Sequence, residues 1–459
     1  MIVESSGPKI IVLALVWVAC VMAVCARCMR GGSVGLPVAY VIATTALYCG
    51  AVSYSVPDYS HLRYGGDLYL QSKEFTDRTV LLGLMTSTLG MVGFTVGVFL
   101  TGRTADQIKR LKRNPPMPPG RNIDVFVLAL LCVGVLGFAL AILNIKFPLS
   151  GAIILAARNA PIVALVLGVW NDFHRLGRVR YLRWGSIFVA VCATYVLFLG
   201  FASYAFILGA IVAGYWLVRL RPHWIKTGGL LTLGFGGFYL SVSVFVAWLS
   251  FRSNLRAVTW GGGNLSDRFA ELMSMVTNIS ILSPVDFESL DLLNARFNQA
   301  IYVGKAVEFH AVHEGLKLHG ESLWMSLFAW VPRFLWPDKP RLGGADLISE
   351  HTGLEFAEGI SFGAGVIFEF FINFGYIGVF FGMLLVGMFI NGIDKRAYNY
   401  ISSGKFALFA AWFALGMIFI DPLLTSFFIV SGAVFSWLMM HSVALGLDLV
   451  SQPNRANRV

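Results

Sequence analysis

Charged residues are scarce in this chain. Only 13% of its 459 residues are Asp, Glu, Lys or Arg, while 57% are hydrophobic and the mean hydropathy is +0.72. About a quarter of a soluble domain is charged, so this composition excludes an ordinary soluble domain. The apolar runs are continuous rather than alternating, which also argues against a membrane β-barrel.

Cysteines are few as well, and none lies in the long polar segment at 251–361. All six lie in or beside apolar runs, so no disulfide framework holds that segment. Cys25 and Cys28 form a single C-x-x-C without a second pair, which favours packing over a metal or redox site. The first apolar run lacks a basic start and a small-residue cleavage site, so we expect a membrane span there rather than a signal peptide.

Long hydrophobic runs dominate what is present. About 20 apolar residues cross a bilayer as a helix. We predict an all-α, polytopic integral membrane protein with about eleven transmembrane helices, within a range of ten to fourteen, one large extracytoplasmic loop and additional half-helices. The predicted spans are 10–27, 35–56, 79–101, 123–145, 152–171, 184–201, 203–219, 228–250, 364–392, 405–421 and 423–447.

The net charge of +10 indicates topology rather than nucleic-acid binding. Basic residues collect in the short connections at 102–122, 172–183 and 219–227, and short basic loops stay in the cytoplasm. The segment 251–361 instead holds thirteen acidic and nine basic residues, so we expect it to face outward. The predicted organisation is an N-terminal bundle of about eight spans (1–250), this loop (251–361) and a C-terminal bundle of about three spans (362–459).

A metal site is one interpretation of the histidines in the loop. A helix over 295–318 would place His310, His313 and Glu314 around one face, with Glu321 nearby. The H-x-x-H-E order matches neither H-E-x-x-H nor H-x-x-E-H, however. We therefore predict no metal, and solvated loop histidines are the simpler alternative.

Charges within apolar stretches are more informative, because an unpaired charge there is costly. Arg333 lies in the apolar stretch 323–336, and Arg158 lies inside the fifth run, where Asn159 and Pro161 suggest a broken helix. Glu369 opens a segment that we expect to be a half-helix ending at Gly375. Guanidinium groups bind phosphate through paired hydrogen bonds, although arginines beside a span can also simply anchor a loop to lipid headgroups.

Two stretches carry a family resemblance. One is Arg296-Phe-Asn298-Gln299, and the other is Pro332-Arg333-Phe-Leu-Trp336-Pro-Asp338-Lys339-Pro340, followed by Glu369 and Asn373-Phe-Gly375. Over about 80 residues this pattern resembles bacterial oligosaccharide repeat-unit polymerases of the Wzy type. The rest of the chain shares only the general plan of many spans and one large loop.

The resemblance implies a reaction at the outer face of a bacterial inner membrane, with the large loop in the periplasm. A growing glycan leaves its polyprenyl-pyrophosphate carrier and joins the acceptor hydroxyl of another carrier-linked oligosaccharide. The product is O-antigen, capsule or exopolysaccharide. The resemblance implies no cofactor and no nucleic acid. The partners it implies are the lipid-linked substrate, membrane lipids, a chain-length regulator and a flippase.

Residue roles follow from that chemistry. A base must take the acceptor proton, and cations must stabilise the leaving pyrophosphate. The catalytic candidates are Glu369, His310 and Arg333, with His313, Glu314 and Asp338 as further bases. The substrate-binding candidates are Arg158, Arg296, Asn298, Gln299, Trp336, Asp338, Lys339, Arg341 and Asn373.

Three alternatives stay open at this point. A ligase that moves finished polymer from the same carrier shares the leaving group, so the arginines do not separate it from a polymerase. A transporter would carry ionisable residues through its spans, often with inverted repeats. A structural subunit of an export complex would tolerate loss of Arg333 and Glu369.

Overall fold

In the computed structural model, residues 6–56, 75–103, 123–143, 145, 150–199, 202–219, 265–277, 294, 297–313, 317–332, 335–339, 344–356 and 363–451 are described. Every regular element in those ranges is helical, as the sequence predicts. The elements are α1 Ser6–Met29, α2 Leu36–Tyr48, η1 Cys49–Ser55, α4 Asp77–Leu100, α6 Ile123–Ile142, α7 Ser150–Leu176, α8 Tyr181–Leu199, α9 Ala202–Arg219, α11 Leu265–Thr277, α13 Ala300–Val312, α14 Glu321–Ser326, α15 Gly344–Thr352, α16 Gly365–Ser402, α17 Phe406–Ile418 and α18 Ser426–Ser451.

Seven helices in the described ranges are long and apolar enough to cross a membrane: α1, α2 with η1, α4, α6, α7, α16 and α18. Apolar stretches in α8, α9 and α17 are shorter. The 13 residues of α17 rise about 20 Å, which is less than the hydrocarbon core of about 30 Å. The predicted span 228–250 lies outside the described residues, so the total of eleven stays a prediction.

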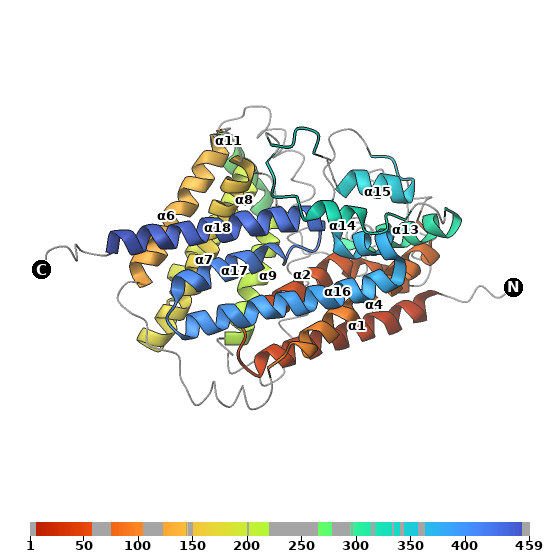
Figure 1. Cartoon of the computed structure of the whole chain (residues 1–459), viewed down its shortest axis with the longest axis horizontal. Helices are drawn as coiled ribbons and strands as arrows, with labels where there is room; N and C mark the ends of the chain where they lie inside the picture. Colours follow the sequence, from red (N-terminus) through yellow and green to blue (C-terminus); the bar gives the residue numbers. More distant parts are fainter. Residues whose placement is uncertain are drawn as a thin grey trace, which may run out of the picture.

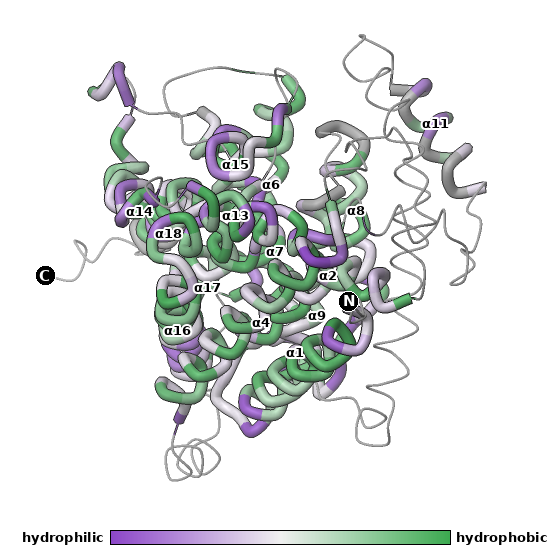
Figure 2. Tube along the Cα trace, turned by 90° about the vertical axis from the view of Figure 1, so that its right-hand side faces the viewer, coloured by the Kyte–Doolittle hydropathy of each residue, from purple (hydrophilic) through white to green (hydrophobic). Residues whose placement is uncertain are grey.

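The long helices α1, α16 and α18 run roughly along the longest axis of the molecule, whereas α6 and α7 cross it steeply (Figure 1). The short helices α13, α14 and α15 gather at one end, which we call the loop end. Arg27, Arg103 and Lys395 line a common pocket at the opposite end, which we call the basic end. Seen from the loop end, hydrophilic residues lie on α14 and α15, whereas α1 and α4 are largely hydrophobic (Figure 2).

Spans from both sides of the central loop share one core, because α4 packs along α16 and α13. Glycines allow the close approach. A side chain at Gly97 would collide with the Leu384 carbonyl of α16, and one at Gly83 would collide with the Ala300 carbonyl of α13. Small residues let membrane helices pack backbone to backbone in this way. The contact fixes α13 against the start of α4.

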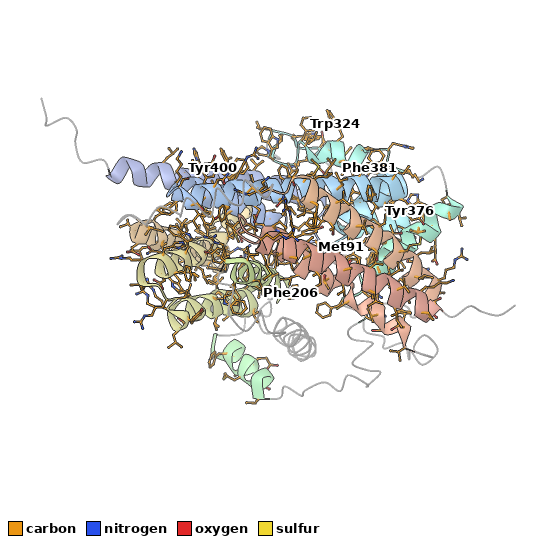
Figure 3. All side chains as sticks on the ribbon, turned by 90° about the horizontal axis from the view of Figure 1, so that it is seen from below. Met91, Phe206, Trp324, Tyr376, Phe381 and Tyr400 are labelled. Carbon is orange, nitrogen blue, oxygen red and sulfur yellow. The ribbon has the colours of Figure 1, made fainter. Side chains whose placement is uncertain are left out.

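The outer surface of the bundle is apolar, as a lipid-facing surface requires. Phe381 of α16 is 57% exposed and Trp324 of α14 is 63% exposed, while Met91 of α4 is fully buried (Figure 3). In water, exposed apolar side chains in this number would promote aggregation. Their positions along α1, α6 and α16 therefore agree with a membrane environment.

Helix α16 breaks where the sequence predicts the end of a half-helix. Gly375 has φ 63° and ψ −151°, which is not helical and suits a residue without Cβ. The break divides a short helix that holds Glu369 and Asn373 from a second helix that continues to Ser402. The fold thereby places Glu369 and Asn373 at the loop end.

In contrast to the break at Gly375, two predictions about helices were wrong. The helix expected over 295–318 begins at Ala300 and ends at Val312, and His313 leaves the helical conformation with φ −116° and ψ 67°. The break expected near Arg158 does not occur, since α7 continues through Pro161. The Pro161 ring packs directly against Gly134 of α6. A neighbouring helix can support a membrane helix at a proline.

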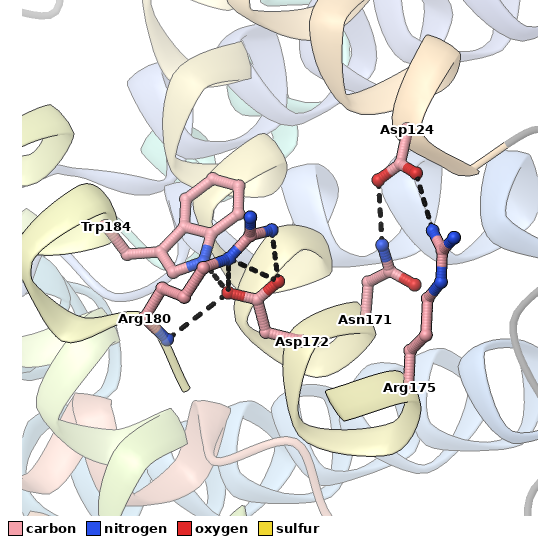
Figure 4. A network of polar contacts seen from close by, with 6 residues as sticks. All are labelled: Asp124, Asn171, Asp172, Arg175, Arg180 and Trp184. Carbon is pink, nitrogen blue, oxygen red and sulfur yellow. Dashed lines mark hydrogen bonds and ion pairs between the residues drawn. The ribbon is translucent and has the colours of Figure 1, made fainter. Parts of the chain in front are cut away.

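The turn between α7 and α8 is held by Asp172 (Figure 4). Its carboxylate, which is 1% exposed, pairs with the Arg180 guanidinium at 2.6 Å and accepts a hydrogen bond from the Trp184 indole N–H at 2.7 Å. The exposed pair of Arg175 and Asp124 lies nearby at 3.1 Å. These contacts join α6, α7 and α8.

Candidate functional site

The Glu369 carboxylate is the centre of a buried hydrogen-bond network at the loop end. It is 1% exposed. Oε1 accepts hydrogen bonds from the hydroxyls of Ser322 at 3.0 Å and Ser426 at 2.7 Å, and Oε2 accepts one from the Ser426 backbone N–H at 2.7 Å. All of these donors are neutral. Glu369 therefore joins the first turn of α14 and the start of α18 to the half-helix of α16.

Asn373 extends this network by one helical turn. Its amide NH₂ donates to the Ser322 hydroxyl at 2.8 Å, and its Oδ1 accepts from the Gly320 backbone N–H at 2.8 Å. Gly320 (φ 97°) and the preceding His319 (φ 45°) both adopt left-handed conformations. Asn373 thus fixes the turn that starts α14, which agrees with a positioning role for this side chain.

Arg158 is a charged side chain within a span that has no ion pair among the described residues. Its guanidinium lies over the Tyr195 ring, 5.4 Å from the centroid, and its Nε is buried without a hydrogen-bond acceptor. Tyr195 stacks in turn on Tyr204 at 5.5 Å. Cation–π contact offsets part of the desolvation of a guanidinium but leaves its charge uncompensated.

Asp421 connects the Arg158 region to the loop end. It lies between α17 and α18, and like Arg158 it is within electrostatic range of Tyr204. Its Oδ1 accepts a hydrogen bond from the Leu423 N–H at 3.0 Å, which forms the turn that the Asp-Pro pair predicts. The turn leads directly to Ser426, the partner of Glu369.

His310 packs against a histidine that the sequence reasoning did not select. The rings of His310 on α13 and His351 on α15 stack with centroids 5.2 Å apart. They are 5% and 1% exposed, and none of their four ring nitrogens has a hydrogen-bond partner. Burial lowers the pKa of both, that of His310 to about 4. Both imidazoles are therefore neutral near pH 7, and a neutral imidazole nitrogen can accept a proton.

The loop histidines do not lie in a cluster of possible metal ligands in the described part of the chain, where no group of three His, Cys, Asp or Glu side chains converges. His310 points inward, whereas the exposed His313 stacks on Phe309 at 4.4 Å. The two histidines face different sides because the helix ends at Val312. Glu314 lies outside the described residues.

Other predicted substrate-binding residues lie in two places. Lys339 is buried, donates to the carbonyls of Ala329 at 2.5 Å and Val331 at 2.9 Å, and lies over the Phe427 ring of α18 at 4.9 Å. Asp338 beside it is exposed, and Trp336 is partly buried. Lys339 thereby connects the residues that follow α14 to α18.

Asn298 and Gln299 lie elsewhere, at the start of α13 against the end of α2. Asn298 donates to the Asn294 side chain at 2.6 Å, and the Gln299 backbone N–H donates to the Leu47 carbonyl at 3.0 Å. Both side chains are buried, and the Asn298 Oδ1 has no donor. The structure does not bring them into the Glu369 network. Arg296, Arg333 and Arg341 lie outside the described residues.

Sequence reasoning missed four residues of these clusters, namely Ser322, Ser426, His351 and Tyr195. Serines and tyrosines are common in membrane helices, so only their proximity to Glu369 and Arg158 distinguishes them. His351 had a usable signal, since it is a histidine in the same polar loop as His310.

No protein-family model, curated protein or solved structure matches this chain.

Proposed function

We propose that this protein is a membrane glycosyltransferase that polymerises polyprenyl-pyrophosphate-linked oligosaccharide repeat units at the outer face of a bacterial inner membrane. The observation that carries the proposal is Arg158. A half-buried guanidinium inside a span, with no acidic partner among the described residues, calls for an anion, and guanidinium groups bind phosphate oxygens through paired hydrogen bonds. The likeness of the loop motifs to Wzy-type polymerases agrees with that ligand.

In the proposed reaction an acceptor hydroxyl attacks the anomeric carbon of the donor glycan. The new glycosidic bond forms, the bond to the pyrophosphate oxygen breaks, and polyprenyl pyrophosphate leaves with the bonding electrons. We assign Arg158, with Arg333 and Arg341 from the loop, to the charge that develops on the leaving group. One preorganised donor of this kind contributes about 100-fold or more to the rate.

The hydroxyl proton needs an acceptor, and we propose His310 as the first choice. Its imidazole is neutral at physiological pH because its pKa is lowered to about 4. It can therefore accept a proton, with a smaller driving force than a base whose pKa lies near the working pH. Glu369 is the second choice, since both its carboxylate oxygens already accept hydrogen bonds. With these bonds intact, Glu369 instead positions α14 and the turn before it.

Complementation of a deletion strain tests the proposal. With wild-type protein we expect long glycans, and with Arg158→Gln only single repeat units on their normal acceptor. Arg183→Gln is the matched control, because Arg183 is an exposed arginine far from the loop end and should support full-length chains. Protein level and membrane insertion must be equal in all strains.

Each glycan profile has a distinct meaning. Full-length chains with Arg158→Gln would refute the role of Arg158. In the deletion strain, full-length chains that accumulate on the lipid carrier would identify a ligase, and an unchanged profile would refute both enzyme functions. Arg333→Ala is expected to act like Arg158→Gln, and chelators are expected to leave chain growth unchanged.

A further inference from the structure

A second cationic site lies at the basic end of the bundle, remote from the proposed reaction. Arg27 near the end of α1, Arg103 just after α4 and Lys395 on α16 line one pocket. The same pocket is lined by the polar Asn391 and by the short segment between α1 and α2, Gly31–Ser33. Residues more than 290 positions apart in the sequence thus converge there.

The three basic side chains are held in place by uncharged groups. Arg103 donates to the Lys395 carbonyl at 3.1 Å and to the Asn399 side chain at 2.7 Å. Arg27 donates to the Arg103 carbonyl, and Lys395 donates to the Thr101 carbonyl. None of the three makes an ion pair in the described residues. Each keeps further N–H donors, since a guanidinium has five and an ammonium three.

The carboxylate of Asp394 lies within electrostatic range of Arg103 and Lys395. Asp394 is fully buried and is not among the residues that line the pocket. Its Oδ1 accepts the backbone N–H groups of Val34 at 3.1 Å and Leu36 at 3.0 Å, at the start of α2. The positive end of that helix therefore balances Asp394, and the three cations keep an excess of positive charge.

The backbone of the pocket adds donors. Gly31 and Gly32 have φ values of 124° and 81°, and the N–H groups of Gly32 and Ser33 donate to no acceptor in the described part of the chain. Successive N–H groups in such conformations form a concave anion site. A side chain at Gly32 would collide with Arg103, so glycine is needed for the arginine to reach this position.

We propose that this pocket binds a phosphate group, supplied either by an anionic lipid headgroup or by a soluble phosphate compound. Guanidinium, ammonium and free backbone N–H groups are the donors that recognise phosphate oxygens. Basic pockets between spans on the cytoplasmic side bind anionic headgroups, and the predicted topology places the basic end on that side. The site is independent of the polymerase proposal.

The test is phosphate-dependent stabilisation of the full-length protein, purified in detergent. We would measure the thermal unfolding midpoint during titration with phosphatidylglycerol, with phosphatidylcholine as the neutral control. Parallel titrations would use inorganic phosphate and chloride at equal ionic strength. We expect phosphatidylglycerol to raise the thermal unfolding midpoint if the ligand is a lipid, and phosphate to raise it if a soluble compound suffices.

Variants connect the effect to the pocket. Arg103→Gln and Lys395→Gln should each weaken binding about fivefold or more, whereas the exposed Arg183→Gln should not. Lys395→Arg keeps the charge and should keep the binding. If neither phosphatidylglycerol nor phosphate raises the thermal unfolding midpoint of the wild-type protein, the proposal is overturned. This outcome does not depend on whether a variant folds. Equal weakening by Arg183→Gln would also overturn the proposal, because non-specific attraction would then explain the effect.

Discussion

Glu369 and Asp172 lie equally deep in the bundle, each 1% exposed, but their partners differ in charge. Asp172 is neutralised by the Arg180 guanidinium and closes the turn from α7 to α8. Glu369 accepts hydrogen bonds only from neutral serine groups. One carboxylate therefore has a counter-charge, whereas the other has none among the described residues, and burial without a counter-charge is costly.

The same contrast applies to two arginines of α7 and its following turn. Arg180 has an acidic partner, whereas Arg158 lies over the Tyr195 ring and makes no ion pair among the described residues. Asp172, the partner of Arg180, lies about 20 Å further along α7 than Arg158. The paired charges stabilise the junction of α7 and α8, and under the proposed function the charge of Arg158 is the one that binds the pyrophosphate.

The largest expected effect comes from Glu369→Ala, which leaves buried donors of Ser322 and Ser426 without an acceptor. We expect a loss of about 3 kcal/mol in the free energy of unfolding, measured as a lower thermal midpoint in detergent, with loss of chain growth. Glu369→Gln keeps an acceptor oxygen. If Glu369 is a positioning residue, Gln should retain much of the activity; loss of activity at an unchanged midpoint would identify it as the base.

Asp172→Ala should act on stability alone. Removal of the carboxylate leaves the Trp184 N–H and the half-exposed Arg180 without their acceptor, at a cost of about 2 kcal/mol. The thermal midpoint should fall, while the folded protein in membranes still makes chains of normal length. Shorter glycan chains at an equal protein level would contradict the claim that Asp172, unlike Glu369, acts on stability alone.

The stacked histidines predict a pH dependence. His310 has a folded pKa of about 4, below its unfolded value of about 6.5. Protonation therefore favours the unfolded state, and stability should be constant above pH 6.5 and fall as the pH drops toward 4, by about 1 kcal/mol per pH unit. His310→Phe keeps the ring packing and should flatten this slope. A slope equal to that of the wild type would show that other groups cause it.

The smallest effect is expected at the exposed ion pair beside Asp172. Arg175 and Asp124 are both more than half exposed, and exposed pairs contribute about 0.5 kcal/mol or less. Arg175→Gln should leave the thermal midpoint nearly unchanged, and added salt should reduce the remaining difference because it screens exposed charges. A drop as large as that of Asp172→Ala would show that the two pairs act as one network.

Local sequence signals predicted the helical parts of the site well. The Asn373-Phe-Gly375 pattern indicated the break in α16, and the single arginine in the fifth apolar run identified Arg158. Predictions that depend on contacts between helices were wrong. The helix of His310 ended early, so His313 faces away, and Pro161 did not break α7 because α6 supports it. Such outcomes depend on neighbouring helices, which local periodicity does not contain.

The sequence by itself determined that the chain is helical and embedded in a membrane, because long uncharged apolar runs have no other stable environment. Only the tertiary structure decided which polar groups meet. Glu369 finds its partners 47 and 57 positions away, and His351 reaches His310 through the contact of α13 with α15. These pairings follow from backbone approach at glycines such as Gly83, which sets how helices pack and therefore which buried charges stay without a counter-charge.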